Sequence, residues 1–222
     1  FPSRNQYLRQ RINYLIELGL TQEAADQSRQ FVRNAGGDPS AYVTIGEALR
    51  RGGQVDSAIG VLEMGVLEFP ENSQIKLALA QAYLDKGYTR SAGGLVEQAA
   101  ARDFELYHEA AEIFRRAGEL RRALYLNSQV PDEERKTRQR FNLLLALERY
   151  EQAVALEPRL ERIGALQDDS VRYAIAYAHF QVGRYDEAAA HTNQISSQEY
   201  FGRATQLRQA IESVRSERVL YF

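Results

Sequence analysis

The sequence predicts an all-α protein: a solenoid of about six helix-turn-helix repeats that ends in a C-terminal capping helix. Three observations support this fold class. A turn of the form Gly-x-x-x-x-Ala recurs along the chain, and apolar residues flank each turn at helical spacing. Helix-forming residues also dominate the chain of 222 residues, which contains only five prolines.

The recurring turn places a small residue where two helices must meet. Its glycine can end a helix because the left-handed backbone conformation costs glycine little. The alanine that follows is expected where the second helix crosses the first, since a larger side chain would push the two apart. A further copy, at Glu148, keeps the alanine but has glutamate in place of glycine. Successive alanines are 34, 34, 31, 30 and 35 residues apart, at Ala24, Ala58, Ala92, Ala123, Ala153 and Ala188.

The helices are expected in pairs, one pair to a repeat. In the second repeat, Ile59, Leu62 and Val66 follow the turn at helical spacing, and Pro70 then breaks the helix before the next unit. The expected pairs span about 4–35, 39–69, 73–102, 104–128, 132–166 and 168–195. They belong to repeats at about 5–38, 39–72, 73–103, 104–133, 134–168 and 169–196 of a single domain over 1–222.

The fourth and fifth repeats depart from this pattern, because they are short and neither ends on the expected proline. Their second helices are expected to be clipped or irregular, with Pro131 and Pro158 in or near the connections. After the sixth repeat, Ser196 and Glu199 have the spacing of a capping box. We therefore expect a capping helix at about 197–218, which covers the apolar face of the last repeat.

These units resemble tetratricopeptide repeats, a family of helix-turn-helix units of 34 residues with small or aromatic residues at set positions. The second repeat matches best, and the third and sixth supply smaller sets of matching residues. In the second repeat the matching residues are Tyr42, Ile45, Gly46, Leu49, Gly53, Val55, Ala58 and Pro70. The resemblance covers about residues 5–196 and implies a right-handed superhelix whose first helices line a concave groove.

The resemblance also implies that this groove binds a protein or peptide partner. Groove-facing positions of each first helix are three and four residues apart, which gives one stripe along the helix. Asn and Gln can hold a peptide backbone, Arg can bind a carboxylate, and aromatic rings supply rigid contact area. The candidate residues are Arg9, Asn13, Glu47, Arg50, Gln81, His108, Glu112, Arg115, Arg138, Asn142, Tyr173 and Tyr177, with Val43, Gln74 and Leu77 beside them.

Alternatives remain for parts of this stripe. Its polar residues can equally form a solvated face. The row of Tyr173, Tyr177 and Phe180 is an apolar anchor for a partner if it is exposed, and core if the terminal helix folds over it. A clamp for a C-terminal carboxylate, which one subclass of the family uses, is disfavoured because Glu47 would repel the carboxylate.

The sequence lacks the motifs of common catalytic and cofactor sites, so we expect neither an enzyme nor a bound cofactor or metal. It contains no cysteine, no phosphate-binding loop and no Gly-x-Ser-x-Gly elbow. The histidines, His108, His179 and His191, show no His-x-x-x-His or His-Glu-x-x-His spacing, and we expect each to be partly exposed. The formal net charge of -2 and the acidic residues within the basic stretch 115–140 argue against nucleic acid.

We therefore expect a non-catalytic scaffold or adaptor that binds a partner protein or peptide. A self-assembling structural solenoid, and hence a homo-oligomer, is the main alternative. A nucleic-acid binder or an enzyme built on helical repeats is the least favoured. All of these functions could use the same helical repeats, so the fold class alone does not distinguish among them.

The location is expected from composition and from the resemblance together. No apolar stretch is long enough to cross a bilayer. The chain begins at Phe1 without a methionine, so we expect a processed or trimmed fragment. Its high arginine content and lack of cysteine suggest a bacterial protein, similar to envelope-associated tetratricopeptide proteins of polymer-export or secretion machinery. This favours the periplasm or cell envelope over the cytoplasm.

Overall fold

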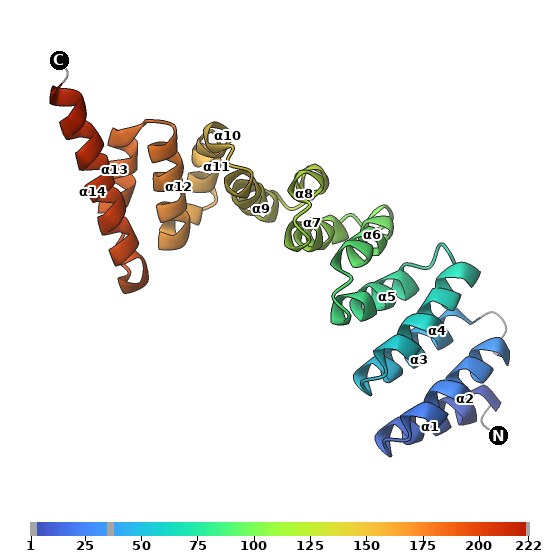
Figure 1. Ribbon diagram of the computed structural model, residues 1–222. Coiled ribbons are helices and arrows are strands. Elements are labelled where there is room, and N and C mark those ends of the chain that lie inside the picture. The colour runs from blue at the N-terminus through green and yellow to red at the C-terminus, as the bar shows by residue number, and fades with distance from the viewer. Residues whose placement is uncertain (1–3, 35–37, 221–222) are drawn as a thin grey trace. The chain divides into compact units, whose positions relative to one another are not determined.

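The computed structural model describes residues 4–34 and 38–220, and these residues form helices joined by short turns, with no strand among them (Figure 1). They belong to two compact units, residues 1–129 and 130–222, each of which is described by itself. The single array expected over 1–222 therefore stays a prediction. Among the helices described, none combines the length and the apolar character that a bilayer-crossing helix requires.

Unit 1 consists of consecutive helix pairs. Within it, α1, α3 and α5 pack against one another in turn, while α7 packs against α6 and α8. The pairs are α1 (Arg4–Glu17) with α2 (Thr21–Asn34), α3 (Pro39–Arg51) with α4 (Val55–Glu68), α5 (Ser73–Asp85) with α6 (Thr89–Ala100), and α7 (Leu106–Arg116) with α8 (Leu120–Asn127).

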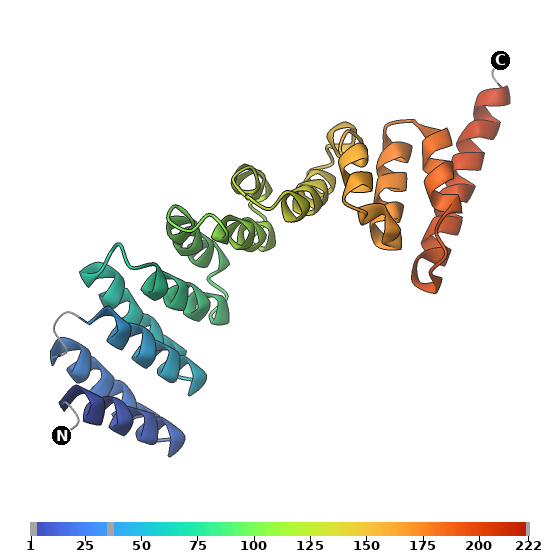
Figure 2. The same ribbon diagram turned by 180° about the vertical axis from the view of Figure 1, so that it is seen from behind.

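Unit 2 begins with an irregular repeat and ends in a long helix. In both views, α12, α13 and α14 lie side by side (Figure 1, Figure 2). The elements are α9 (Glu133–Ala146), α10 (Tyr150–Val154), α11 (Glu157–Arg162), the 3-10 turn η1 (Ala165–Gln167), α12 (Asp169–Gln181), α13 (Tyr185–Asn193) and α14 (Gln198–Leu220). These elements and those of unit 1 confirm the all-α solenoid repeats expected from the sequence.

The repeat alanines are fully buried, as the sequence predicts for residues at a close helix contact. Each of the six is 0% exposed: Ala24, Ala58, Ala92, Ala123, Ala153 and Ala188. The contact leaves no room for a larger side chain, because protein interiors are close-packed. The near-constant spacing of the alanines therefore indicates one close contact between two helices in each repeat.

The turn before each alanine uses a left-handed residue. Five of these residues are glycines with φ between 73° and 80°, at Gly19, Gly53, Gly87, Gly118 and Gly183. In the fifth repeat Glu148 takes the same conformation, with φ 56°. A side chain at Gly183 would meet no atom within 4 Å, so the preference for glycine there is conformational and not steric.

The fourth and fifth repeats are irregular, as expected. The second helix of the fourth repeat, α8, has only eight residues. In the fifth repeat, α10 ends after five residues, and the chain turns at Leu156 before it enters α11. Pro158 lies in the first turn of α11, where its missing N–H removes no helical hydrogen bond.

The terminal helix covers the last repeat, but its start is capped differently from the expectation. α14 begins at Gln198, so Ser196 is not at the N-cap of the expected capping box. Instead, the backbone N–H groups of Ser196 and Ser197 donate to Asp169 at the start of α12, at 3.0 and 2.7 Å. The hydrogen bond from Ser197 holds the pKa of Asp169 below its usual range. Asp169 thus fastens α14 to α12.

Replacing Glu148 by glycine should stabilise the protein. A side chain in the left-handed region costs roughly 1–2 kcal/mol, and the greater freedom of glycine in the unfolded chain offsets part of that cost. We expect the free energy of unfolding in urea to rise by about 0.5–1 kcal/mol. The matched change Gly183→Ala should lower it by about 1 kcal/mol; a loss of stability in Glu148→Gly would contradict this account.

Replacing Asp169 should loosen the terminal helix. Asp169→Asn removes a charged acceptor for two backbone donors, so we expect the free energy of unfolding to fall by about 1–2 kcal/mol at neutral pH. The difference should shrink as the pH falls through the lowered pKa of Asp169, where the wild-type carboxylate becomes protonated.

Asp186→Asn is the control for this change. Asp186 also reaches α14, through an ion pair with Arg215, but its side chain is 93% exposed. Exposed pairs contribute little, so a change of no more than about 0.5 kcal/mol is expected. Hydrogen exchange of the α14 amides checks both variants, and equal protection of α14 in both would show that Asp169 does not fasten it.

Candidate functional site

A hollow of about 500 Å³ lies along α3 and α5 in unit 1. Its floor is apolar, and its polar side chains stand three residues apart on α3 and seven residues apart on α5. Six of its seven lining residues are those that the sequence places on the groove stripe. The seven are Val43, Glu47 and Arg50 from α3, and Gln74, Leu77, Ala78 and Gln81 from α5.

The charged residues of this hollow already have partners. Nη1 of Arg50 donates to Asp85 at 2.8 Å, and Nε2 of Gln81 donates to the other oxygen of Asp85 at 3.3 Å. The hydrogen bond from Arg50 holds the pKa of Asp85 below its usual range. Glu47 accepts from Arg51, one turn along the same helix, at 2.6 Å. The hollow is therefore polar at its rim without a strong net charge.

The candidates of the first and fourth repeats lie outside this hollow. The side chain of Arg9 is outside the part of the chain that the structure describes, and Asn13 is exposed on α1. On α7, His108 is partly buried, and Arg115 donates twice to Glu112, at 2.8 and 2.7 Å. These two bonds hold the pKa of Glu112 below its usual range. Glu112 and Arg115 thus largely neutralise each other.

In unit 2, Arg138 and Asn142 share a second hollow of about 320 Å³. Both lie on α9, and Ser170 of α12 lines the same hollow. Nε of Arg138 also donates to Glu134 at 3.0 Å. This hollow is smaller than the one along α3 and α5, and Phe141 and Leu160 contribute apolar surface to it.

The aromatic row of α12 packs against the terminal helix. Tyr173, Tyr177 and Phe180 are partly buried against a core cluster that includes Leu207 and Ile211 of α14. The rings of Tyr173 and Tyr200 lie 6.0 Å apart, and those of Tyr177 and Tyr150 lie 5.9 Å apart. Of the two alternatives for this row, the structure therefore supports the one in which the terminal helix folds over it.

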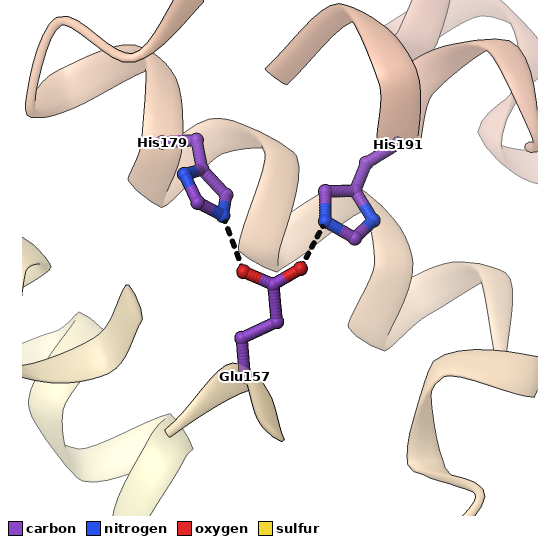
Figure 3. A group of neighbouring side chains, drawn as sticks. All are labelled: Glu157, His179 and His191. Carbon is purple, nitrogen blue, oxygen red and sulfur yellow. Dashed lines mark hydrogen bonds and ion pairs between the residues drawn. The ribbon is translucent and has the colours of Figure 1, made fainter. Parts of the chain in front are cut away.

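Sequence reasoning missed a cluster of two histidines and a glutamate in unit 2 (Figure 3). Nε2 of His179 and Nε2 of His191 each lie 2.8 Å from a different oxygen of the Glu157 carboxylate. The two imidazole rings are stacked, with centroids 5.5 Å apart and planes at 20°. His179 is 2% exposed and His191 is 9% exposed, so the prediction that both are partly exposed was wrong.

The cluster arises from three helices that the sequence separates. His179 lies on α12, His191 on α13, and Glu157 is the first residue of α11. The break at Leu156 redirects the chain so that Glu157 faces α12 and α13. The sequence predicts an irregular second helix here, but no local spacing encodes the direction that the chain takes after the break. Helical periodicity does carry one signal, since His179 follows the buried Ile175 by four residues and His191 follows Ala188 by three.

The carboxylate of Glu157 is ionised in this arrangement. Burial on its own raises the pKa of Glu157, but the hydrogen bonds from His179 and His191 outweigh it and hold the pKa below the usual range. Two imidazole nitrogens and a carboxylate are also ligands that bind divalent transition metals. Among the described residues, this cluster is the one group of three or more histidine, cysteine or acidic side chains that could hold a metal ion.

The comparisons with known proteins bear on the fold. No protein-family model matches the chain, and no curated protein matches it either. A solved tetratricopeptide-repeat protein from Parabacteroides merdae is 14% identical, with a TM-score of 0.54, and the match covers 96% of this chain and 87% of that one.

Two other solved structures are similar over much of the chain at lower TM-scores. A thermophilic tetratricopeptide-repeat protein from Thermus thermophilus is 22% identical, with a TM-score of 0.40, over 79% of this chain and 98% of that one. The protein MamA of AMB-1 is 20% identical, with a TM-score of 0.43, over 93% of this chain and 92% of that one. The repeat geometry and the match to the Parabacteroides structure together give the chain the tetratricopeptide-repeat fold.

Proposed function

We propose that the chain is a non-catalytic scaffold that binds a protein partner through the hollow along α3 and α5. The observation that carries this proposal is the hollow itself, about 500 Å³ with an apolar floor and a polar rim, built by the first helices of two successive repeats. Clefts of this size and composition are typical of binding sites. Its lining residues form one stripe on α3 and one on α5, and this arrangement suits an extended or helical peptide segment.

The lining of the hollow defines the chemistry of the partner. Val43, Leu77 and Ala78 offer apolar surface to one or two apolar side chains. Gln74 and Gln81 stand at the rim with amides that can donate to and accept from a peptide backbone. Because Arg50 is already bound to Asp85, a partner carboxylate would have to displace an existing ion pair. The preferred partner is therefore an uncharged segment with an apolar anchor.

Two alternatives have less support. Four arginines of the stretch 115–140 that a nucleic acid would need are engaged in ion pairs with acids, namely Arg115, Arg116, Arg122 and Arg138. Self-assembly through Tyr173 and Tyr177 is disfavoured because both are partly buried, Tyr173 beside Tyr200 of α14 and Tyr177 beside Tyr150 of α10. Homo-oligomerisation through other surfaces remains a prediction, as does the bacterial cell envelope as the site of action.

A peptide selection tests the hollow. A phage-displayed library of random peptides is selected on the full chain, and the dissociation constants of enriched peptides are measured by fluorescence anisotropy. We expect enriched peptides to carry an apolar anchor. Leu77→Glu should weaken their binding by about tenfold or more, since it places a charge in the apolar floor.

Gln98→Glu is the matched control for this test. It adds the same charge at an exposed position on α6, a second helix, and it should leave binding unchanged. Circular dichroism of both variants confirms that the fold is retained. If the selected peptides bind wild type and Leu77→Glu equally well, the hollow is not the binding surface.

A further inference from the structure

We propose that Glu157, His179 and His191 form a binding site for a divalent transition-metal ion of the zinc class. The proposal concerns unit 2 only and does not depend on the peptide hollow of unit 1. Two imidazole nitrogens and one carboxylate oxygen form the protein part of a four-coordinate zinc site, which leaves one position for water or another ligand.

The distances fit an ion after a small rearrangement. Zinc bonds to nitrogen and oxygen are about 2.0–2.2 Å long, so the ligand atoms of a tetrahedral ion lie about 3.3–3.5 Å apart. One ligand atom from each of the three residues lies within 4.8 Å of the other two, and each Nε2 lies 2.8 Å from the carboxylate. To admit a tetrahedral ion, the carboxylate would have to move away from the two rings, and the two Nε2 atoms would have to lie about 3.3–3.5 Å apart.

The Nε2 atoms of the two rings point towards the same carboxylate. Figure 3 shows the carboxylate of Glu157 between two imidazoles whose Nε2 atoms point towards it. Among the described residues, Nδ1 of neither His179 nor His191 has a hydrogen-bond partner, although both atoms are buried. Buried polar atoms usually have at least one hydrogen-bond partner. Within the described part of the chain, the only polar contact of each ring is with the Glu157 carboxylate, where an ion would be held.

An ion can reach this point from outside. A hollow of about 480 Å³ has Glu157 and His191 in its wall. Glu161 and Glu187 also line it, against the single positive charge of Arg172. Its excess of carboxylates favours the approach of a cation. The side chain of Glu157 is 30% exposed, so its carboxylate has room to move towards the hollow when the ion enters.

The three ligands lie on helices and not on loops. Glu157 is in the first turn of α11, and the two histidines lie within α12 and α13, which pack against each other. Rigid helices hold the two histidines near their binding positions before the ion arrives, so that only the Glu157 side chain has far to move. An ion bound to all three would also join α11 to α12 and α13, and would stabilise unit 2 by mass action.

The test uses the untagged full chain after treatment with a chelator. Isothermal titration with Zn²⁺ should show one ion bound per chain. Zn²⁺ at one hundred times its dissociation constant should raise the melting temperature by about 5 °C or more. Glu157→Gln, which keeps the shape of the side chain, should weaken Zn²⁺ binding by at least about tenfold.

Nuclear magnetic resonance identifies the ligands without a change to the cluster. The chain has only three histidines, so ¹⁵N-histidine labelling gives three ring systems, and His108→Asn assigns the one outside the cluster. On addition of Zn²⁺ we expect the Nε2 signals of His179 and His191 to shift, the ring proton of each to lie on Nδ1, and His108 to stay unchanged.

Two results would overturn the proposal. One is the absence of a one-to-one complex with Zn²⁺ in the folded wild type. The other is a complex that leaves the Nε2 signals of His179 and His191 unchanged. A purely structural role for the cluster predicts a different pattern: Glu157→Gln lowers the melting temperature equally with chelator and with Zn²⁺.

Discussion

The close contact of two helices at one small residue is the constraint on which the rest of this structure depends. In the second repeat, a methyl group on Gly46 would lie 2.5 Å from Cγ of Leu62, and one on Gly65 would lie 2.8 Å from the ring of Tyr42. A larger side chain would therefore separate α3 from α4. Because each repeat packs only on its neighbours, the tilt of one pair sets the position of the next. The hollow between α3 and α5 keeps its width only while these contacts hold.

In the fifth repeat, only the start of the second helix makes this close contact. Ala153 is fully buried, so α10 begins in register with the other second helices. The helix then ends at Val154, and α11 starts afresh with Glu157. A continuous helix would carry residue 157 further along the axis of α10. The break instead brings a carboxylate to face α12 and α13. The two histidines there occupy positions that are apolar or aromatic in most other repeats, such as Leu49 and Val61 in the second.

The sequence predicts features that arise from contacts within one repeat or between adjacent repeats. The buried alanines follow from the turn spacing, and six of the seven residues of the α3–α5 hollow follow from the three- and four-residue stripe. It does not predict the cluster, because Glu157 meets His179 only after the irregular turn at Leu156, where the chain departs from the repeat pattern. It also misses the Asp169 cap, since that contact joins the first helix of the last repeat to the segment that follows the repeats.

The cluster of Glu157, His179 and His191 also differs from the hollow along α3 and α5 in the free energy that its polar groups cost the fold. The empty hollow along α3 and α5 costs the fold little free energy, because its polar side chains are bound to one another or exposed to water. A carboxylate and two buried imidazoles must give up water for a few hydrogen bonds, and apolar side chains of similar size are often at least as stabilising in such positions. Packing alone therefore gives no reason for Glu157, His179 and His191 to be polar. A bound ion gives such a reason, because its positive charge pairs with the carboxylate and it accepts a lone pair from each ring nitrogen.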